Sequence, residues 1–183
     1  MPNIVASVII SLDGYDANAS FEPTAEEHAY FNALFGASDS IILDVPNHEL
    51  LVPYWDEIDL NDPGVNAVER EFARIFRSRP RHVVTTSGEG LEPLATPISG
   101  DLVQSISALR EQPGQQILLA GDTDLLGFCL NHGLVDEVQV VVRPVVLGDG
   151  MAPFGDVQAS HQLHLLELRP FASGAFVARY AVG

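Results

Sequence analysis

The chain alternates short unbroken apolar runs with longer stretches in which apolar residues recur every three or four positions. The unbroken runs are rich in β-branched residues and cover residues 3–11, 40–43, 81–86, 116–119 and 138–147. Such runs are typical of strands that are covered on both faces. The helically spaced stretches predict helices within residues 24–36, 65–77, 101–110 and 123–131.

This order of elements predicts an α/β fold in which helices flank a mixed, mostly parallel sheet. Residues 162–170 and 175–182 surround Ser173-Gly174 and predict a C-terminal antiparallel hairpin. A chain of 183 residues can bury a full core, so we expect a single domain over residues 1–183.

Several helix ends have recognisable signals. Thr24 and Glu27 have the spacing of a capping box, and Gly36 is expected to end the helix that they begin. Asp101 is expected to cap the helix that follows it.

Composition limits the partners. Nine basic and 25 acidic residues give a net charge of -16, which repels nucleic acid, anionic membranes and phosphate-bearing ligands. The chain has neither a basic, apolar leader nor a 20-residue apolar run, so no signal peptide or membrane span is expected. Cys129 is the single cysteine and is expected to be a buried thiol in a reducing compartment, which favours the cytoplasm. The six histidines are scattered, so no metal site is expected.

The stretch 117–130 is the clearest candidate for a cofactor site. It predicts a buried strand, a tight turn at Gly121 and a helix, an arrangement that presents backbone N–H groups and a positive helix end to an anion such as a nucleotide phosphate. An ordinary strand–helix connection has the same pattern, because one glycine is not a fingerprint.

Two motifs indicate a family. Residues 6–17 read ASVIISLDGYDA, with a Ser-Leu-Asp-Gly-aromatic element, and residues 132–154 read HGLVDEVQVVVRPVVLGDGMAPF. Together they resemble the dihydrofolate reductase-like superfamily, in the branch of the C-terminal reductase domain of bacterial riboflavin biosynthesis (RibD). The resemblance spans nearly the whole chain and is more specific for the family than for the activity.

The resemblance implies a reductase that uses NADPH or NADH on a small heterocyclic, pterin-like or pyrimidine-like substrate. It places Asp13 and Gly14 against the nicotinamide, with Asp13 or a water as the proton donor. It places Gly121, Asp122 and Thr123 at the pyrophosphate. The substrate-pocket residues predicted beside them are Tyr15, Tyr54, Trp55, Leu147, Gly148 and Gly150.

Three phosphate-facing positions depart from the family pattern. Asp44 follows its strand where many relatives have glycine and then arginine, although a strand-end turn residue would look the same. Ser87 keeps the family serine, but the cation that follows it in many relatives, and that can hold the 2′-phosphate of NADPH, is missing, and Glu89 lies at the same turn. A carboxylate there would repel a phosphate by roughly 3 kcal/mol at ~6 Å and an effective dielectric of ~20. Asp122 replaces one of several consecutive glycines.

Two functions therefore remain open. One is the NAD(P)H-dependent reductase. The other is a dihydrofolate reductase-like protein with impaired cofactor binding, which acts as a ligand-binding protein or in non-redox chemistry. A flavin would meet the same repulsion. The expected partner in either case is a small molecule. Because relatives tend to be homodimers, a homodimer is also expected, with residues 138–147 as a possible part of its interface.

Overall fold

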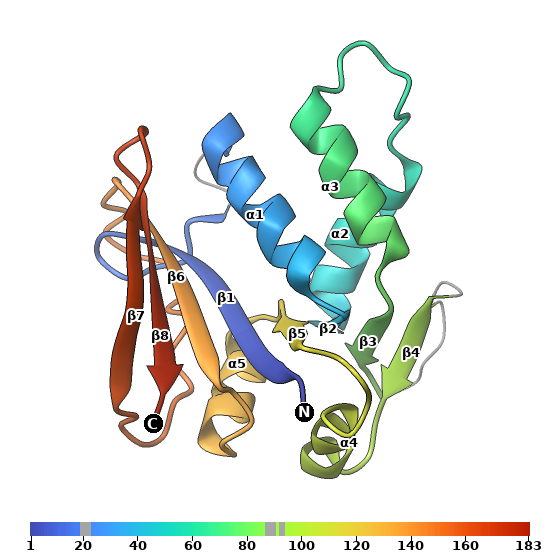
Figure 1. Cartoon of the computed structure of the whole chain (residues 1–183). Helices are drawn as coiled ribbons and strands as arrows, with labels where there is room; N and C mark the ends of the chain where they lie inside the picture. Colours follow the sequence, from blue (N-terminus) through green and yellow to red (C-terminus); the bar gives the residue numbers. More distant parts are fainter. Residues whose placement is uncertain (19–22, 87–90, 92–93) are drawn as a thin grey trace.

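The computed structural model describes residues 1–18, 23–86, 91 and 94–183, and the strands in these residues form one sheet (Figure 1). Its order is β4-β3-β2-β5-β1-β6-β8-β7. The strands are β1 (Asn3–Ser11), β2 (Ser40–Asp44), β3 (Arg81–Val84), β4 (Ala95–Ile98), β5 (Gln116–Leu119), β6 (Glu137–Arg143), β7 (Leu163–Pro170) and β8 (Phe176–Val182). All pairs from β4 to β6 are parallel, whereas β8 pairs antiparallel with both β6 and β7. The prediction of a mixed, mostly parallel sheet that ends in an antiparallel hairpin is confirmed.

Helices cover both faces of the sheet (Figure 1). They are α1 (Ala25–Ala37), α2 (Val45–Glu57), α3 (Ala67–Ser78), α4 (Leu102–Leu109) and α5 (Thr123–Asn131). Successive strand residues point to opposite faces, so Val5 and Leu118 pack with α1 and α3 while Ile4 and Ile117 pack with α4 and α5. No helix in the described part of the chain is both long and apolar enough to cross a bilayer.

Most helix starts follow the sequence signals. Thr24 and Glu27 form the predicted capping box of α1, and Asp101 caps α4 through the N–H of Gln104 at 2.9 Å. Gly36 does not end α1, which continues to Ala37, so that prediction is wrong. Gly36 lies at a packing contact instead, because a Cβ built there would be 3.7 Å from the Cδ1 atom of Ile75.

The sequence did not predict helix α2. Asp44 caps it, Pro46 occupies its first turn, and Pro53 lies inside it. Proline suits the first turn of a helix but normally breaks its interior, so the two prolines hid the helical pattern.

The connections leave an opening between β1 and β5. Of the residues of β1, only 3–6 pair with β5, and β6 is the only strand that pairs with residues 7–11. Ile10 also forms an isolated antiparallel bridge with Asp16. Chain leaving β1 passes through α1 on one face toward β2, whereas chain leaving β5 passes through α5 on the other face toward β6. The carboxyl ends of β1 and β5 therefore form a topological switch point, where α/β sheets bind ligands.

Candidate active site

Two hollows meet at this switch point. The α5-side hollow, of about 420 Å³, lies toward the start of α5. The α1-side hollow, of about 310 Å³, lies toward α1 and α2. Six residues line both hollows, which makes them one cleft: Ser7, Ile9, Asn18, Asn47, Leu50 and Gly121.

The α1-side hollow is apolar and aromatic. The ring of Phe72 packs against two other aromatic rings of the hollow. Its centroid lies 4.6 Å from that of Trp55 and 4.8 Å from that of Phe35. Phe35 and Phe72 are buried members of the core, so folding of the core fixes this wall. Of the described residues that line the hollow, His28 is the only one with an ionisable side chain.

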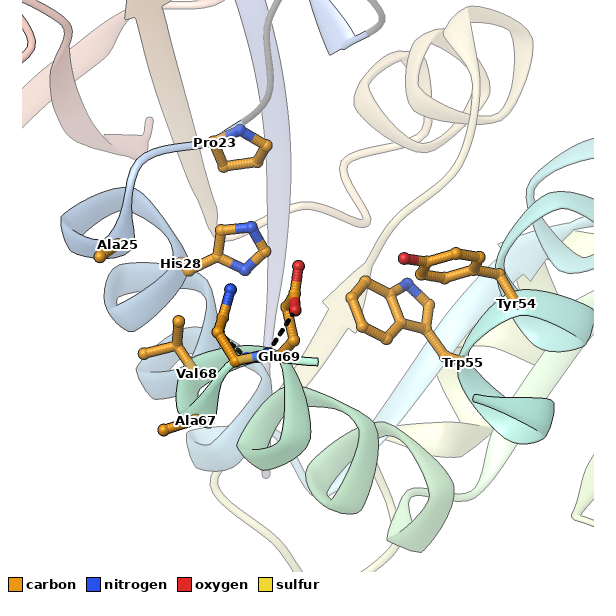
Figure 2. A pocket seen from close by; sticks show the side chains of 9 residues that line it. Pro23, Ala25, His28, Tyr54, Trp55, Ala67, Val68 and Glu69 are labelled. Atoms are coloured by element: carbon orange, nitrogen blue, oxygen red, sulfur yellow. Dashed lines mark hydrogen bonds between the residues drawn. The ribbon is translucent and has the colours of Figure 1, made fainter. Parts of the chain in front are cut away.

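A third, outer hollow of about 670 Å³ adjoins the α1-side hollow and shares Pro23, His28 and Trp55 with it. Figure 2 shows that its side chains come from α1, α2 and the start of α3, with Glu69 between His28 and Trp55. Tyr54 and Trp55 meet edge to face, with centroids 4.8 Å apart. The aromatic pair predicted from the sequence therefore lines a hollow.

The α5-side hollow is acidic. The buried carboxylate of Asp44 accepts the N–H of Asn47 at 2.7 Å at the start of α2, and its second oxygen accepts the N–H of Asp122. The Asp122 carboxylate in turn caps α5 by accepting the N–H of Leu125 at 3.1 Å. Three backbone donors that could help to hold a phosphate, the N–H groups of Asn47, Asp122 and Leu125, are thus already bound to the protein's own carboxylates.

These carboxylates also affect one another. Burial raises the pKa of Asp122, and the charges on Asp44 and Asp124 raise it further, against the opposing effect of the Leu125 N–H. A hydrogen bond with Asp156, together with its charge, raises the pKa of Asp124. Negative charge is therefore concentrated at the start of α5, where a dinucleotide phosphate would lie.

Asp13 fastens two loops together at the rim of the cleft. Its carboxylate accepts the N–H groups of Leu147 at 3.1 Å and Gly148 at 2.7 Å. The Ser11 hydroxyl, together with these N–H groups, lowers the pKa of Asp13 to about 2. The catalytic role of Asp13 stays a prediction, but a carboxylate with this pKa holds no proton to donate at neutral pH.

Other predicted residues lie in the same two loops. Gly14 has a φ of +90°, and Gly150 has a φ of +143°. A Cβ atom on Gly150 would be 3.2 Å from the Cβ atom of Tyr15, so the two loops approach closely. The structure thus brings Asp13, Gly14, Tyr15, Leu147, Gly148 and Gly150 together at the rim. Neighbours of these residues supply the lining of the α5-side hollow: Asp16, Asn18, Met151 and Pro153.

The remaining predicted positions divide into two groups. Gly121, Asp122 and Thr123 line the α5-side hollow, next to Asp44. Ser87 and Glu89 lie outside the described residues. None of these binding roles has been tested, so all of them stay predictions.

Sequence reasoning missed the α1 face of the cleft. His28, Phe31 and Phe35 line the α1-side hollow and follow one another at helical spacing along α1. The same periodicity that predicted the helix could have identified this stripe, had it been separated from the buried stripe that contains Tyr30 and Leu34.

The cleft fits one end of a nicotinamide dinucleotide better than the other. Val8, Leu126 and Met151 give the α5-side hollow apolar surfaces that suit a flat ring. The diphosphate would meet the carboxylates of Asp44 and Asp122, which oppose its binding, so this end fits less well. In the described residues, no group of three or more His, Cys, Asp or Glu side chains is arranged to hold a metal ion.

Known proteins resemble this chain over nearly its whole length. The Bacillus subtilis protein YyaP is 26% identical over 174 residues, which cover 93% of this chain and 90% of YyaP. A putative riboflavin biosynthesis protein from Shewanella sp. PV-4 superposes with a TM-score of 0.73 at 19% identity, covering 99% of both chains.

Two further solved structures are similar at lower identity. A pyrimidine reductase-like protein from Corynebacterium diphtheriae has a TM-score of 0.66 at 14% identity, with 100% of this chain and 92% of that chain covered. The dihydrofolate reductase of Schistosoma mansoni has a TM-score of 0.67 at 11% identity, with 100% and 99% covered. These likenesses show a dihydrofolate reductase-like fold.

The model of the RibD C-terminal domain family matches residues 2–177, which is nearly the whole chain. The two sequence motifs, the sheet order and the cleft at the switch point all agree with this match. The chain therefore belongs to the RibD C-terminal domain family.

Proposed function

We propose that this chain is a nicotinamide-dependent reductase of a small, flat heterocycle. The observation that carries the proposal is that the two hollows meet at the switch point and share Ser7, Ile9 and Gly121. Rings in the α1-side and α5-side hollows would meet at these shared residues. A bound NADPH or NADH would supply the hydride.

The α1-side hollow supports a flat aromatic substrate. Phe31, Phe35 and Trp55 offer ring surfaces to such a molecule, and aromatic surfaces favour offset or edge contacts with flat ligands. Reduction of a heterocycle also requires a proton at the neighbouring heteroatom. We assign this proton to His28, because imidazole exchanges protons near neutral pH and His28 lines the hollow, whereas Asp13 does not.

A second candidate function has its own support. Asp44 and Asp122 accept three backbone N–H groups at the starts of α2 and α5, those of Asn47, Asp122 and Leu125. A protein that no longer binds a dinucleotide could keep the α1-side hollow and use it for ligand binding or non-redox chemistry.

A titration with NADPH and with NADH at ~0.15 M salt separates the two functions. Trp55, the only tryptophan, lines the α1-side hollow and reports binding by its fluorescence. Saturation at micromolar cofactor supports the reductase. No response up to millimolar cofactor rejects it and favours the second candidate.

The role of His28 has a separate test. If His28 delivers the proton, His28→Gln lowers kcat at least about 100-fold and removes the corresponding limb of its pH profile. The control is His132→Gln, because His132 lies at the end of α5, where its Nδ1 atom is 2.8 Å from the carbonyl oxygen of Phe128. Equal rates in the two variants would reject the assignment.

We also propose a homodimer. Strand β6 lies inside the sheet and buries Val138 and Val141, so the interface would not form there. Edge strand β7 instead exposes Leu165, Leu166 and Leu168 by 54–59% of their surfaces, and edge strands of this kind tend to pair. Light scattering of the double variant Leu165→Lys/Leu168→Lys should give a monomer mass, and an unchanged dimer mass would reject β7 as the interface.

We place the protein in the cytoplasm. Cys129 is fully buried, and burial raises the pKa of its thiol to about 12, so the thiol is protected from reaction. The cysteine is free, so the chain has no disulfide that would stabilise it in an oxidising compartment. Fractionation of cells that express a tagged chain would test this location.

A further inference from the structure

The outer hollow opens a path for a ligand that is longer than one ring system. It shares Pro23, His28 and Trp55 with the α1-side hollow, so a ring bound beside Phe31 and Phe35 can extend a substituent along Trp55. We infer that the outer hollow receives a positively charged, amine-bearing substituent of that ligand, with Glu69 as its counter-charge. The inference rests on the proposed function only in that the ligand would be the enzyme's substrate.

The lining of the outer hollow has the chemistry of a cation site. Among the described residues that line it, Glu69 has the only formal charge apart from the imidazole of His28. Tyr54 and Trp55 lie across the hollow from Glu69 (Figure 2). Aromatic faces attract ammonium groups, and a carboxylate nearby adds a direct counter-charge.

An anionic substituent has no arginine or lysine partner in the cleft. The chain contains nine arginines and no lysine. All nine arginines lie in the described part of the chain, and none of them lines the outer, the α1-side or the α5-side hollow. A phosphate or carboxylate on the ligand would therefore be desolvated without an arginine or lysine partner.

Arginines close to the outer hollow are bound elsewhere. Arg70 follows Glu69 directly but donates to the carbonyl oxygens of Leu60 and Asp62. Arg77 donates to the carbonyl oxygens of Trp55 and Ile58. Both guanidinium groups bind backbone carbonyls of α2 and of the chain between α2 and α3, and neither arginine lines the hollow.

Helix ends at the hollow do not reverse this preference. Helices α1 and α3 both begin there, and a helix start attracts anions. Each start, however, has a complete capping box in which the protein's own carboxylate is bound. Glu27 accepts the N–H of Thr24 at 2.7 Å, and Glu69 accepts the N–H of Asn66 at 2.9 Å.

Three probes that share a phenyl ring on a four-carbon chain and differ in the charge of the terminal group test the inference: 4-phenylbutylamine, 4-phenylbutanol and 4-phenylbutyrate. Binding is followed by Trp55 fluorescence and by its indole NMR signal at pH 8 and ~0.15 M salt, without any nicotinamide. Histidine is ordinarily neutral at this pH. We expect the amine to bind about 5- to 10-fold more tightly than the alcohol, and the butyrate most weakly.

Glu69→Gln is the test variant. Glutamine at this position retains the capping box of α3, so the fold is kept while the charge is lost. The preference for the amine over the alcohol should fall to about 2-fold or less, with alcohol binding unchanged. Glu49→Gln is the matched control, because Glu49 is an exposed residue of α2 outside the lining and its loss changes the net charge equally.

Three results would overturn the inference: the butyrate binding as tightly as the amine, an amine preference that survives Glu69→Gln, or an unperturbed Trp55 with all three probes. None of these results depends on the dinucleotide titration. If no dinucleotide binds but the amine still binds most tightly of the three probes, the reductase is rejected and the cation site is retained. If a dinucleotide binds but the amine is not preferred, the cation site is rejected and the reductase is retained.

Discussion

The two halves of the cleft share one gap in the sheet but treat charge in opposite ways. The α1-side hollow is lined by apolar and aromatic residues, with His28 as its ionisable side chain among the described residues. Asp16 and Asp122 line the α5-side hollow, and Asp44 lies directly beside it. One half suits a flat uncharged ring, and the other half opposes the phosphates that its helix starts would otherwise attract.

This difference follows from what stabilises each half. Core side chains such as Phe35 and Phe72 build the α1-side hollow, so stability and ligand binding require the same residues. The α5-side hollow is built from helix starts, whose N–H groups can bind either a capping carboxylate or a ligand phosphate. There, stability and cofactor affinity compete for the same donors.

The largest effect is expected from Phe72→Ala. Phe72 is 7% exposed and packs on Phe35, Trp55 and Phe76, so its truncation should lower the free energy of unfolding by about 3–4 kcal/mol. Urea unfolding measures this. Leu50→Ala is the control, because Leu50 lines both hollows but is 70% exposed, and its loss should change stability by about 0.5 kcal/mol or less. If Phe72→Ala and Leu50→Ala lowered the free energy of unfolding equally, the α1-side hollow would not be part of the core.

Asp44→Asn should have the next largest effect, with opposite signs for stability and affinity. Asparagine can accept only one of the two N–H groups that Asp44 now accepts, so the free energy of unfolding should fall by about 1–2 kcal/mol. Removal of the charge should raise NADPH affinity about 10-fold. Calorimetric titration and urea unfolding measure the two changes.

Asp101→Asn is the matched control for Asp44→Asn. Asp101 caps α4 in the same way but does not line the cleft, so this variant should leave NADPH affinity unchanged. If Asp44→Asn gained no affinity over this control, the competition between capping and phosphate binding would be refuted.

The sequence predicted the acids of the α5-side hollow but not how they are connected. Asp44 and Asp122 were identified because each departs from the resembled family at a position expected to face a phosphate. Their direct contact requires β2 and β5 to be neighbours although they lie far apart in the chain. No local pattern contains that neighbour relation.

The same limit explains what was missed elsewhere. The runs that predicted most of the sheet are local, whereas β4 is short, contains Pro97 and escaped notice. The outer hollow needs the starts of α1 and α3 beside the end of α2, and α2 itself was hidden by Pro53. Tyr54 and Trp55 were therefore predicted as pocket residues without the carboxylate of Glu69 that lies across from them.

A smaller effect is expected from pH. The pKa values of Asp122 and Asp124 are raised above 3.8, so acidification should protonate them before ordinary aspartates and raise NADP⁺ affinity about 3-fold. The sign for stability is the same: a raised pKa in the folded state contributes stability that is present below the ordinary value of 3.8 and is lost as the pH rises through the raised pKa. Asp122→Asn should flatten the affinity profile, and an unchanged slope in this variant would assign the effect to other groups.

The smallest effect is expected from Asp13→Asn, at the rim that the two halves share. Because the pKa of Asp13 is lowered to about 2, the carboxylate contributes stability that is present above its ordinary value of 3.8 and is lost as the pH falls toward 2. Between pH 5 and pH 2, the free energy of unfolding of the variant, measured by urea unfolding, should therefore fall less steeply than that of the unchanged protein.

Asp39→Asn is the comparison for this variant, because Asp39 also has a lowered pKa through backbone N–H groups but lies at the opposite end of β5, away from the rim. Both variants should shift the acid limb, and neither should change affinity at the α1-side or the α5-side hollow by more than about 2-fold. If Asp13 supplied a proton in catalysis, Asp13→Asn alone would abolish turnover while binding remained. If it fastens the loops at residues 13 and 147–148, turnover changes no more than binding does, since an ionised carboxylate that already accepts two backbone N–H groups acts through the geometry of the rim.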